Sequence, residues 1–225
     1  MFSAPMNPIV RFAARHIVQC SIKRSGMTKK IVVYIDYKSP YAYLAMNSAR
    51  EMAADLELEI DWLPYSLQID QYLGEVETRN AHQWRRVKYS YMDARRLANE
   101  QGLIVRGPQK LFDSTIAHVG MIFLKETQPD VLESYHNAVF EGFFKRELDI
   151  EQIDQVKTVI ANLGSDGREF EAFLQEKGRL QLRQIITDAE ERLGIFGVPT
   201  FVVGNEIFWG GDQIARVRRF IERSA

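Results

Sequence analysis

The first clear pattern of hydrophobic positions along the chain indicates two strands around one helix. Residues 31–37 form a short apolar run rich in β-branched and aromatic side chains, which is typical of a buried strand. Ser39 and Pro40 follow, and because Ser favours the N-cap and Pro the first helical position, they predict a helix running to about residue 54. Residues 58–63 alternate as a second strand, which Pro64 ends. This β-α-β unit implies parallel strands joined by a right-handed crossover.

A long helical pattern occupies residues 78–193. Ala, Leu, Glu, Arg and Gln recur at helical spacing, and glycines and prolines separate the segments. We interpret this stretch as an all-helical insertion domain. Its predicted helices are about 79–100, 113–126, 129–143, 149–162, 166–175 and 179–193.

The strand pattern then returns. Two short β-branched and aromatic runs, 200–203 and 207–209, flank Gly204-Asn205 and predict a hairpin with a Gly-Asn turn. A closing helix is predicted over 211–223 from its apolar face. The parts on either side of the insertion, 29–77 and 194–225, are therefore interpreted as one α/β domain.

Composition and charge remove several classes of function. The chain has 225 residues, 46% of them hydrophobic and 26% charged, which is typical of a globular protein in water. Its net charge of -1 does not indicate a nucleic acid or a membrane surface as partner. No apolar run approaches the roughly 20 residues that span a bilayer.

Cysteine usage is more restrictive. The chain has one cysteine, Cys20, so a disulfide within the chain and Cys-x-x-Cys dithiol chemistry are both excluded. His82, His118 and His136 do not have the spacing of metal ligands, and we expect no metal site.

Residues 1–28 differ from the rest of the chain. No Asp or Glu precedes Asp36, whereas Arg and Lys recur. Such a segment can be a mitochondrial presequence, but it is short and poor in Ser for one, which favours a disordered leader or an upstream start ahead of Met27. The expected location is the cytoplasm, or the mitochondrion if the segment is a presequence.

Two local motifs connect the halves of the α/β domain. Ser39-Pro40-Tyr41-Ala42 stands at a helix start, and Gly197-Val198-Pro199-Thr200 leads into a strand. With the order β-α-β, helical block, β-β-α, they predict a thioredoxin-like fold with a large helical insertion. In that fold the proline is cis, and the residue before it exposes a free backbone N–H and C=O that can pair with an extended ligand.

These motifs carry a family resemblance. Residues 34–44, 195–203 and 208–212 resemble the kappa-class glutathione transferases and 2-hydroxychromene-2-carboxylate isomerases of the DsbA-like superfamily, and the likeness extends over about 31–224. The resemblance implies glutathione as cofactor, a small aromatic substrate and a homodimer. It implies that the helix N-terminus stabilises the thiolate of glutathione at Ser39.

The resemblance also implies the remaining site residues. Val198, before Pro199, would anchor the peptide backbone of glutathione, and Asp212 beside Gly211 would hold its γ-glutamyl ammonium. The family often has Gly-Asn-x-Pro after its second strand; this chain lacks it, and Asn80 is the candidate replacement. Four further side chains are candidates for the substrate pocket: Tyr41, Tyr43, Lys88 and Trp209.

Three functions remain open from the sequence. The first is a glutathione-dependent isomerase, in which the thiolate adds reversibly to a conjugated substrate of aromatic catabolism. The second is a kappa-type transferase that conjugates glutathione to electrophiles. The third is a catalytically inactive thioredoxin-like protein that binds a peptide beside Val198 and Pro199.

Overall fold

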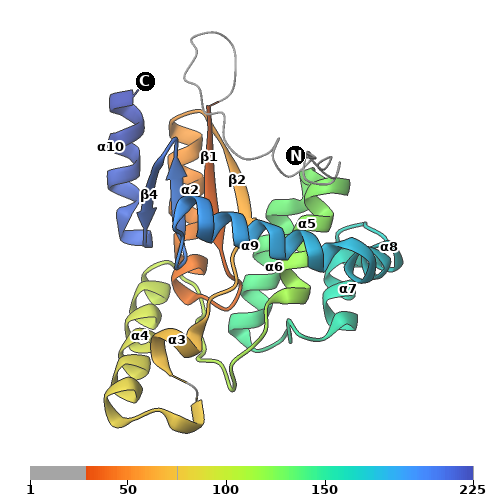
Figure 1. The fold of residues 1–225 in the computed structure, drawn as a ribbon, viewed down its shortest axis with the longest axis horizontal. Helices are drawn as coiled ribbons and strands as arrows, with labels where there is room; N and C mark the ends of the chain where they lie inside the picture. Colours follow the sequence, from red (N-terminus) through yellow and green to blue (C-terminus); the bar gives the residue numbers. More distant parts are fainter. Residues whose placement is uncertain (1–28, 75, 225) are drawn as a thin grey trace, which may run out of the picture.

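A four-stranded mixed sheet forms the centre of the molecule (Figure 1). The computed structural model describes residues 29–74 and 76–224, so the expectations for residues 1–28 lie outside the described residues. The strands are β1 (Lys29–Ile35), β2 (Leu58–Pro64), β3 (Thr200–Val203) and β4 (Glu206–Trp209), in the order β2-β1-β3-β4. β1 pairs in parallel with β2 and antiparallel with β3, and β4 returns antiparallel to β3. The predicted β-α-β unit and hairpin are both confirmed.

Helix α2 (Pro40–Asp55) connects the parallel strands and begins where the sequence predicts. Strand β1 ends two residues earlier than expected, at Ile35, which pairs with Pro64 at the end of β2. Because Pro64 has no N–H to continue the ladder, the chain leaves the sheet here, and Asp36 belongs to the turn into α2. The last helix, α10 (Ile214–Ser224), begins after a short 3-10 turn, η4 (Gly211–Gln213), rather than at residue 211.

The middle of the chain is helical, as predicted, with different boundaries in places. In Figure 1, α3 and α4 lie beyond one end of the strands, and α5 to α8 lie to one side of the sheet. The 166–193 stretch is continuous, because a π-helical turn joins α8 to α9 instead of a break. The elements are α3 (Ile69–Leu73), η1 (Val76–Thr78), α4 (Ala81–Glu100), α5 (Thr115–Thr127), η2 (Pro129–Val131), α6 (Leu132–Lys145), α7 (Ile153–Asn162), α8 (Gly167–Phe173), η3 (Leu174–Gly178) and α9 (Arg179–Leu193).

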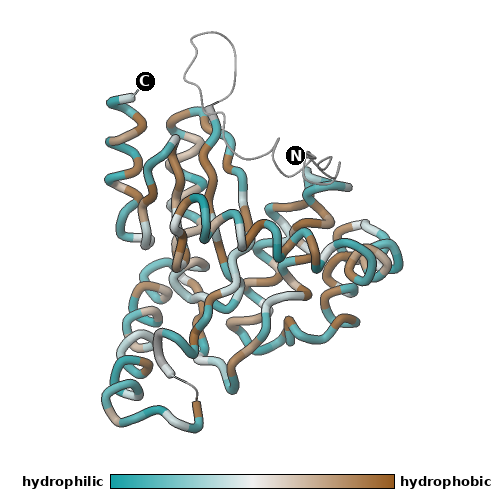
Figure 2. Tube along the Cα trace, viewed as in Figure 1, coloured by the Kyte–Doolittle hydropathy of each residue, from teal (hydrophilic) through white to brown (hydrophobic). Residues whose placement is uncertain are grey.

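One hydrophobic core connects the sheet to the helical segment. Figure 2 shows the central strands as mainly hydrophobic, whereas α4 carries many hydrophilic residues. Tyr43 of α2 stacks on Phe140 and Phe144 of α6, with ring centroids 5.2 and 5.4 Å apart. Such aromatic pairs add to the free energy gained by burial. Among the helices of residues 29–74 and 76–224, none is long and apolar enough to cross a membrane.

Candidate functional site

Ser39 lies at the N-terminus of α2 and is the N-cap of that helix. Its Oγ accepts a hydrogen bond from the N–H of Ala42 at 3.2 Å, and its own N–H donates to the Asp36 carbonyl at 2.9 Å. Since the Ser39 oxygen acts as the acceptor, its hydroxyl hydrogen remains free to donate to a ligand. The helix N-terminus adds a partial positive charge at the same point.

The Val198–Pro199 peptide bond is cis, as the fold predicts. Within the described part of the chain, neither the N–H nor the C=O of Val198 has a hydrogen-bond partner. The carbonyl of Pro199, by contrast, accepts from the N–H of Gly210 at 2.9 Å. The backbone of Val198 is therefore the free edge to which an extended ligand can add.

Ser39 and Val198 open into the same cavity, of about 670 Å³. Its other walls come from α4, from the segment between α4 and α5, and from β4. Tyr41, Lys88 and Trp209 line it as expected. A volume of this order suits a small organic ligand, because such sites occupy roughly 300–1,000 Å³.

The charged side chains on the cavity wall are all cationic. Of the described residues, five basic side chains line it and no Asp or Glu does, although the whole chain has a net charge of -1. Aromatic side chains stand between them, including Trp84, Tyr91 and Phe112. The cavity thus favours an anionic ligand with an aromatic or apolar body. The basic residues are Lys38, Arg79, Lys88, Arg95 and Lys110.

Tyr41 joins the two walls of the cavity. Its hydroxyl donates to Asp93 Oδ2 at 3.0 Å and approaches the Ser90 carbonyl at 3.3 Å, so it ties α2 to α4. Burial and the hydrogen bond to Asp93 raise the pKa of Tyr41 to about 12. The phenol therefore stays protonated at neutral pH and acts as a hydrogen-bond donor.

Behind Ser39, Asp36 holds the turn together. The carboxylate is fully buried and accepts from the N–H groups of Lys38 at 3.1 Å and Leu67 at 2.8 Å, and from the Ser114 hydroxyl. Burial alone would raise its pKa, but the Lys38 ammonium, His118 and the Ser114 hydroxyl outweigh burial and hold the pKa well below its usual range. Asp36 is therefore ionised at neutral pH.

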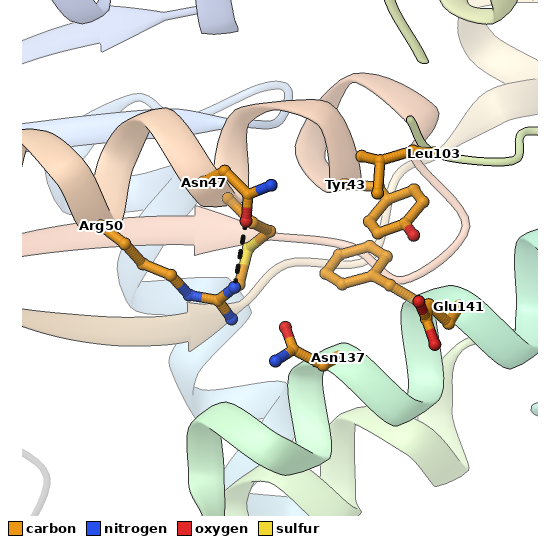
Figure 3. A pocket seen from close by; sticks show the side chains of 8 residues that line it. Tyr43, Asn47, Arg50, Leu103, Asn137 and Glu141 are labelled. Atoms are coloured by element: carbon orange, nitrogen blue, oxygen red, sulfur yellow. Dashed lines mark hydrogen bonds between the residues drawn. The ribbon is translucent and has the colours of Figure 1, made fainter. Parts of the chain in front are cut away.

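Two predicted site residues lie elsewhere. Asn80 does not line the cavity: it is the N-cap of α4, and its side chain accepts from the N–H groups of His82 and Gln83 in a capping box. Tyr43 does not line it either: its side chain lines a second cavity of about 370 Å³ between α2 and α6 (Figure 3). Neither side chain reaches the cavity at Ser39, because one caps a helix and the other packs in the aromatic core.

Gly211 and Asp212 lie in η4, beside the first turn of α2. A Cβ added at Gly211 would come within 3.8 Å of the Tyr41 carbonyl, which places this turn against the helix start. The Asp212 carboxylate is exposed and accepts from the Gln213 amide at 2.7 Å. Neither residue is on the cavity wall, so Asp212 can reach a ligand only where that ligand extends past the rim.

A family model for a DSBA-like thioredoxin domain matches residues 30–222. The chain belongs to this family. It is 28% identical over 185 residues to a 2-hydroxychromene-2-carboxylate isomerase of Pseudomonas putida, covering 80% of this chain and 88% of the relative. It is 27% identical over 187 residues to the uncharacterized protein YwbO of Bacillus subtilis (strain 168), covering 82% and 91%.

A solved structure of a 2-hydroxychromene-2-carboxylate isomerase has the same fold. It superposes with a TM-score of 0.72 at 24% identity, covering 86% of this chain and 95% of that one. The thioredoxin-like fold with helical additions and the family resemblance drawn from the sequence are thus both confirmed.

The sequence analysis did not predict several residues that line the cavity. Lys38 adjoins the Ser-Pro motif, and its position beside a helix start was a usable signal. The cavity is also lined by Trp84 and Tyr91 of α4 and by Arg79 just before it. These residues reach the cavity because α4 folds over the end of the sheet, which the local sequence pattern of α4 does not reveal. In the described part of the chain, no group of three or more His, Cys, Asp or Glu could hold a metal ion.

Proposed function

We propose that this protein is a glutathione-dependent isomerase of the 2-hydroxychromene-2-carboxylate isomerase type. One observation carries the proposal. A serine hydroxyl at a helix N-terminus and the free backbone of Val198 open together into a cavity whose charged lining is entirely cationic among the described residues. Such a site suits a ligand that brings its own thiol and an anionic, partly aromatic substrate. Curated relatives of similar length bear the isomerase name.

In the proposed reaction no atom is gained or lost: the hemiketal ring of the substrate first opens, its C–O bond breaking as the hydroxyl proton moves to the ring oxygen, which leaves a phenol and a conjugated ketone. The glutathione thiolate donates an electron pair to the electrophilic carbon of a conjugated double bond and forms a C–S bond, and the electrons move onto the conjugated oxygen. The former double bond is now single and rotates. Elimination then breaks the C–S bond, restores the double bond with the other geometry and returns the thiolate. Ser39 donates a hydrogen bond to the thiolate sulfur and forms no covalent bond.

We assign the other anchors as part of the same proposal. The cysteinyl backbone of glutathione would pair with the N–H and C=O of Val198. The γ-glutamyl ammonium would extend past the rim to Asp212, and the carboxylate of the substrate would meet Lys88 of α4. The indole of Trp209 and the ring of Tyr41 would contact the apolar body of the substrate.

Glutathione should raise the melting temperature of the protein, because a ligand of the native state stabilises it by mass action. At a glutathione concentration about 100 times the Kd, the gain of about 2.7 kcal/mol corresponds to a shift of about 5–10 °C. S-methylglutathione, which lacks a thiol, is the matched control for binding without chemistry. If millimolar glutathione did not change the melting temperature, both enzymatic functions would be excluded, and the catalytically inactive peptide-binding protein would remain.

Assays with two substrates distinguish an isomerase from a glutathione transferase. We expect isomerisation of 2-hydroxychromene-2-carboxylate in the presence of glutathione and none without it, followed by absorbance. Conjugation of a chlorinated nitrobenzene with no isomerisation would instead identify a kappa-type transferase.

A further inference from the structure

Lys38 stands between Asp36 and Ser39 in the turn from β1 to α2, and its side chain lines the same cavity as Ser39. That side chain is only 10% exposed, which is unusual for a lysine. Its ammonium lies 3.4 Å from Asp36 Oδ2. The ammonium is thus held beside Asp36 rather than free in solvent.

The pair is oriented across the cavity wall. The Asp36 carboxylate is fully buried behind the wall, where the N–H groups of Lys38 and Leu67 and the Ser114 hydroxyl share its negative charge. Lys38 is on the wall, and Asp36 is not among the residues that line it. Lys38 is thus the member of the pair that reaches the cavity, and the pair as a whole is neutral.

We propose that Lys38 is the cation of the thiolate site: its ammonium lowers the pKa of a thiol held at Ser39, and Asp36 positions it. This inference rests on the proposed function, since it assigns a second group to the same site. A serine hydroxyl contributes one hydrogen bond but no charge, and the helix N-terminus contributes only a partial charge. Lys38 brings an ammonium to the cavity lining, with the Asp36 charge behind it, and charges in such an enclosed space interact more strongly than in water.

Other ionisable groups surround the same space. Lys88 and Arg95 line it from α4, and Lys110 lines it from the following segment, where it pairs with Glu151. Asp93 of α4 is held by the Tyr41 hydroxyl, and His118 of α5 lies behind Asp36, with Nε2 3.4 Å from Oδ1. A substitution at Lys38 leaves the side chains of these groups in place, and it changes the pair with Asp36 alone.

The test places a thiol at the site without any ligand. In a Ser39→Cys chain with Cys20→Ser, the pKa of the introduced thiol is read from the rate of alkylation by iodoacetamide against pH. We expect a pKa below the ordinary value of about 8.5, and Lys38→Met should raise it by about one unit, because the nearby positive charge is lost. Lys38→Arg should keep the low value. Lys177→Met, a control far from the cavity, should leave it unchanged.

An unchanged thiol pKa in folded Lys38→Met would overturn the inference. Lys38→Gln keeps an N–H donor for Asp36 and replaces Lys38→Met if the latter does not fold, as judged by thermal melting. A second arm uses the natural Ser39 chain with bound glutathione and follows the ultraviolet absorbance of the thiolate. If glutathione does not bind, the proposed function fails, while the alkylation arm still decides the role of Lys38.

Discussion

At the residue scale, Ser39 is the N-cap of α2 and also lines the cavity, where we propose a chemical role for it. As N-cap it satisfies the Ala42 N–H, a contribution that a serine makes at any helix start. Its hydroxyl hydrogen remains free to donate to an anionic ligand. The backbone N–H and C=O of Val198, which are also free, open into the same cavity. The capping contribution and the proposed chemical role can be separated by experiment. Removing the N-cap residue of a helix that does not border the cavity should lower stability without affecting activity.

Ser39→Ala should lower both stability and activity. Loss of the cap should reduce the free energy of unfolding by about 1 kcal/mol. The pKa of bound glutathione should rise, and turnover should fall by about 10-fold or more because the donor to the thiolate is lost. Asp166→Ala is the matched control, since Asp166 caps α8 with a hydrogen bond to the Arg168 N–H. It should lose similar stability with turnover unchanged; equal turnover in Ser39→Ala would reduce Ser39 to a cap.

The sequence best predicts those candidate site residues that stand in a motif which also determines the local backbone structure. Ser39 and Val198 stand in short motifs whose spacing already fixes their environment. Asn80 and Tyr43 show the opposite case. An Asn three residues before a Gln is equally a capping box, and an aromatic side chain one turn into a buried helix can face either side. Only packing decides such cases.

At the scale of elements, Asp36 connects three parts of the fold. Its carboxylate binds the first turn after β1 through Lys38, the segment after β2 through Leu67, and the start of α5 through Ser114. The helical segment is therefore attached to the sheet directly behind the candidate site. A buried, ionised carboxylate with several donors is costly to disturb.

Asp36→Asn should reduce the free energy of unfolding at pH 7 by about 3 kcal/mol, because Lys38 loses its buried partner. The folded-state pKa of Asp36 is lowered, so its stabilisation is present above the ordinary pKa of 3.8 and is lost as pH falls below it. The difference between the natural chain and the variant should therefore shrink from pH 7 to pH 3 in urea unfolding. Asp154→Asn, at an exposed carboxylate, should stay close to the natural chain at both values.

Helix positions were predictable from periodicity, but several ends were not. The helix expected from residue 149 begins at Ile153, because Asp149 and Glu151 form a turn in which the Asp149 carboxylate accepts the Glu151 N–H. The π-helical turn before α9 has no sequence signature of its own. It preserves helical geometry across Gly178, where packing against Val119 leaves no room for a Cβ. These details depend on contacts between segments that are distant in sequence.

At the scale of the whole molecule, the cationic residues of the cavity lie over a mainly apolar core. Although the chain has a net charge of only -1, the charged residues that line the cavity, among those described, are all cationic. The core beneath is apolar except for a few buried polar groups. His136 is one: its Nδ1 hydrogen-bonds to the Tyr37 hydroxyl at 2.9 Å, and its Nε2 has no partner among the described residues.

Acid should destabilise the whole fold through His136. Burial, followed by the charges of Arg50 and Lys125, lowers the pKa of His136 well below its ordinary 6.5. The unfolded chain binds a proton there below pH 6.5 and the folded chain does not, so stability falls by about 1.4 kcal/mol per pH unit below that value. His136→Gln should flatten this slope in denaturant unfolding. His82→Gln, at an exposed imidazole, should retain it, and equal slopes in both variants would contradict the prediction.

The close approach of Gly197 to Trp209 has a consequence for redesigning the cavity. A Cβ at position 197 would stand 2.5 Å from the indole Nε1, so any larger residue there must displace the ring. Trp209 itself packs on Phe196, with ring centroids 4.9 Å apart, and its outer face is open to solvent. In a mutant library aimed at new substrates, position 209 can therefore be randomised to reshape the entrance, whereas position 197 is best left as glycine.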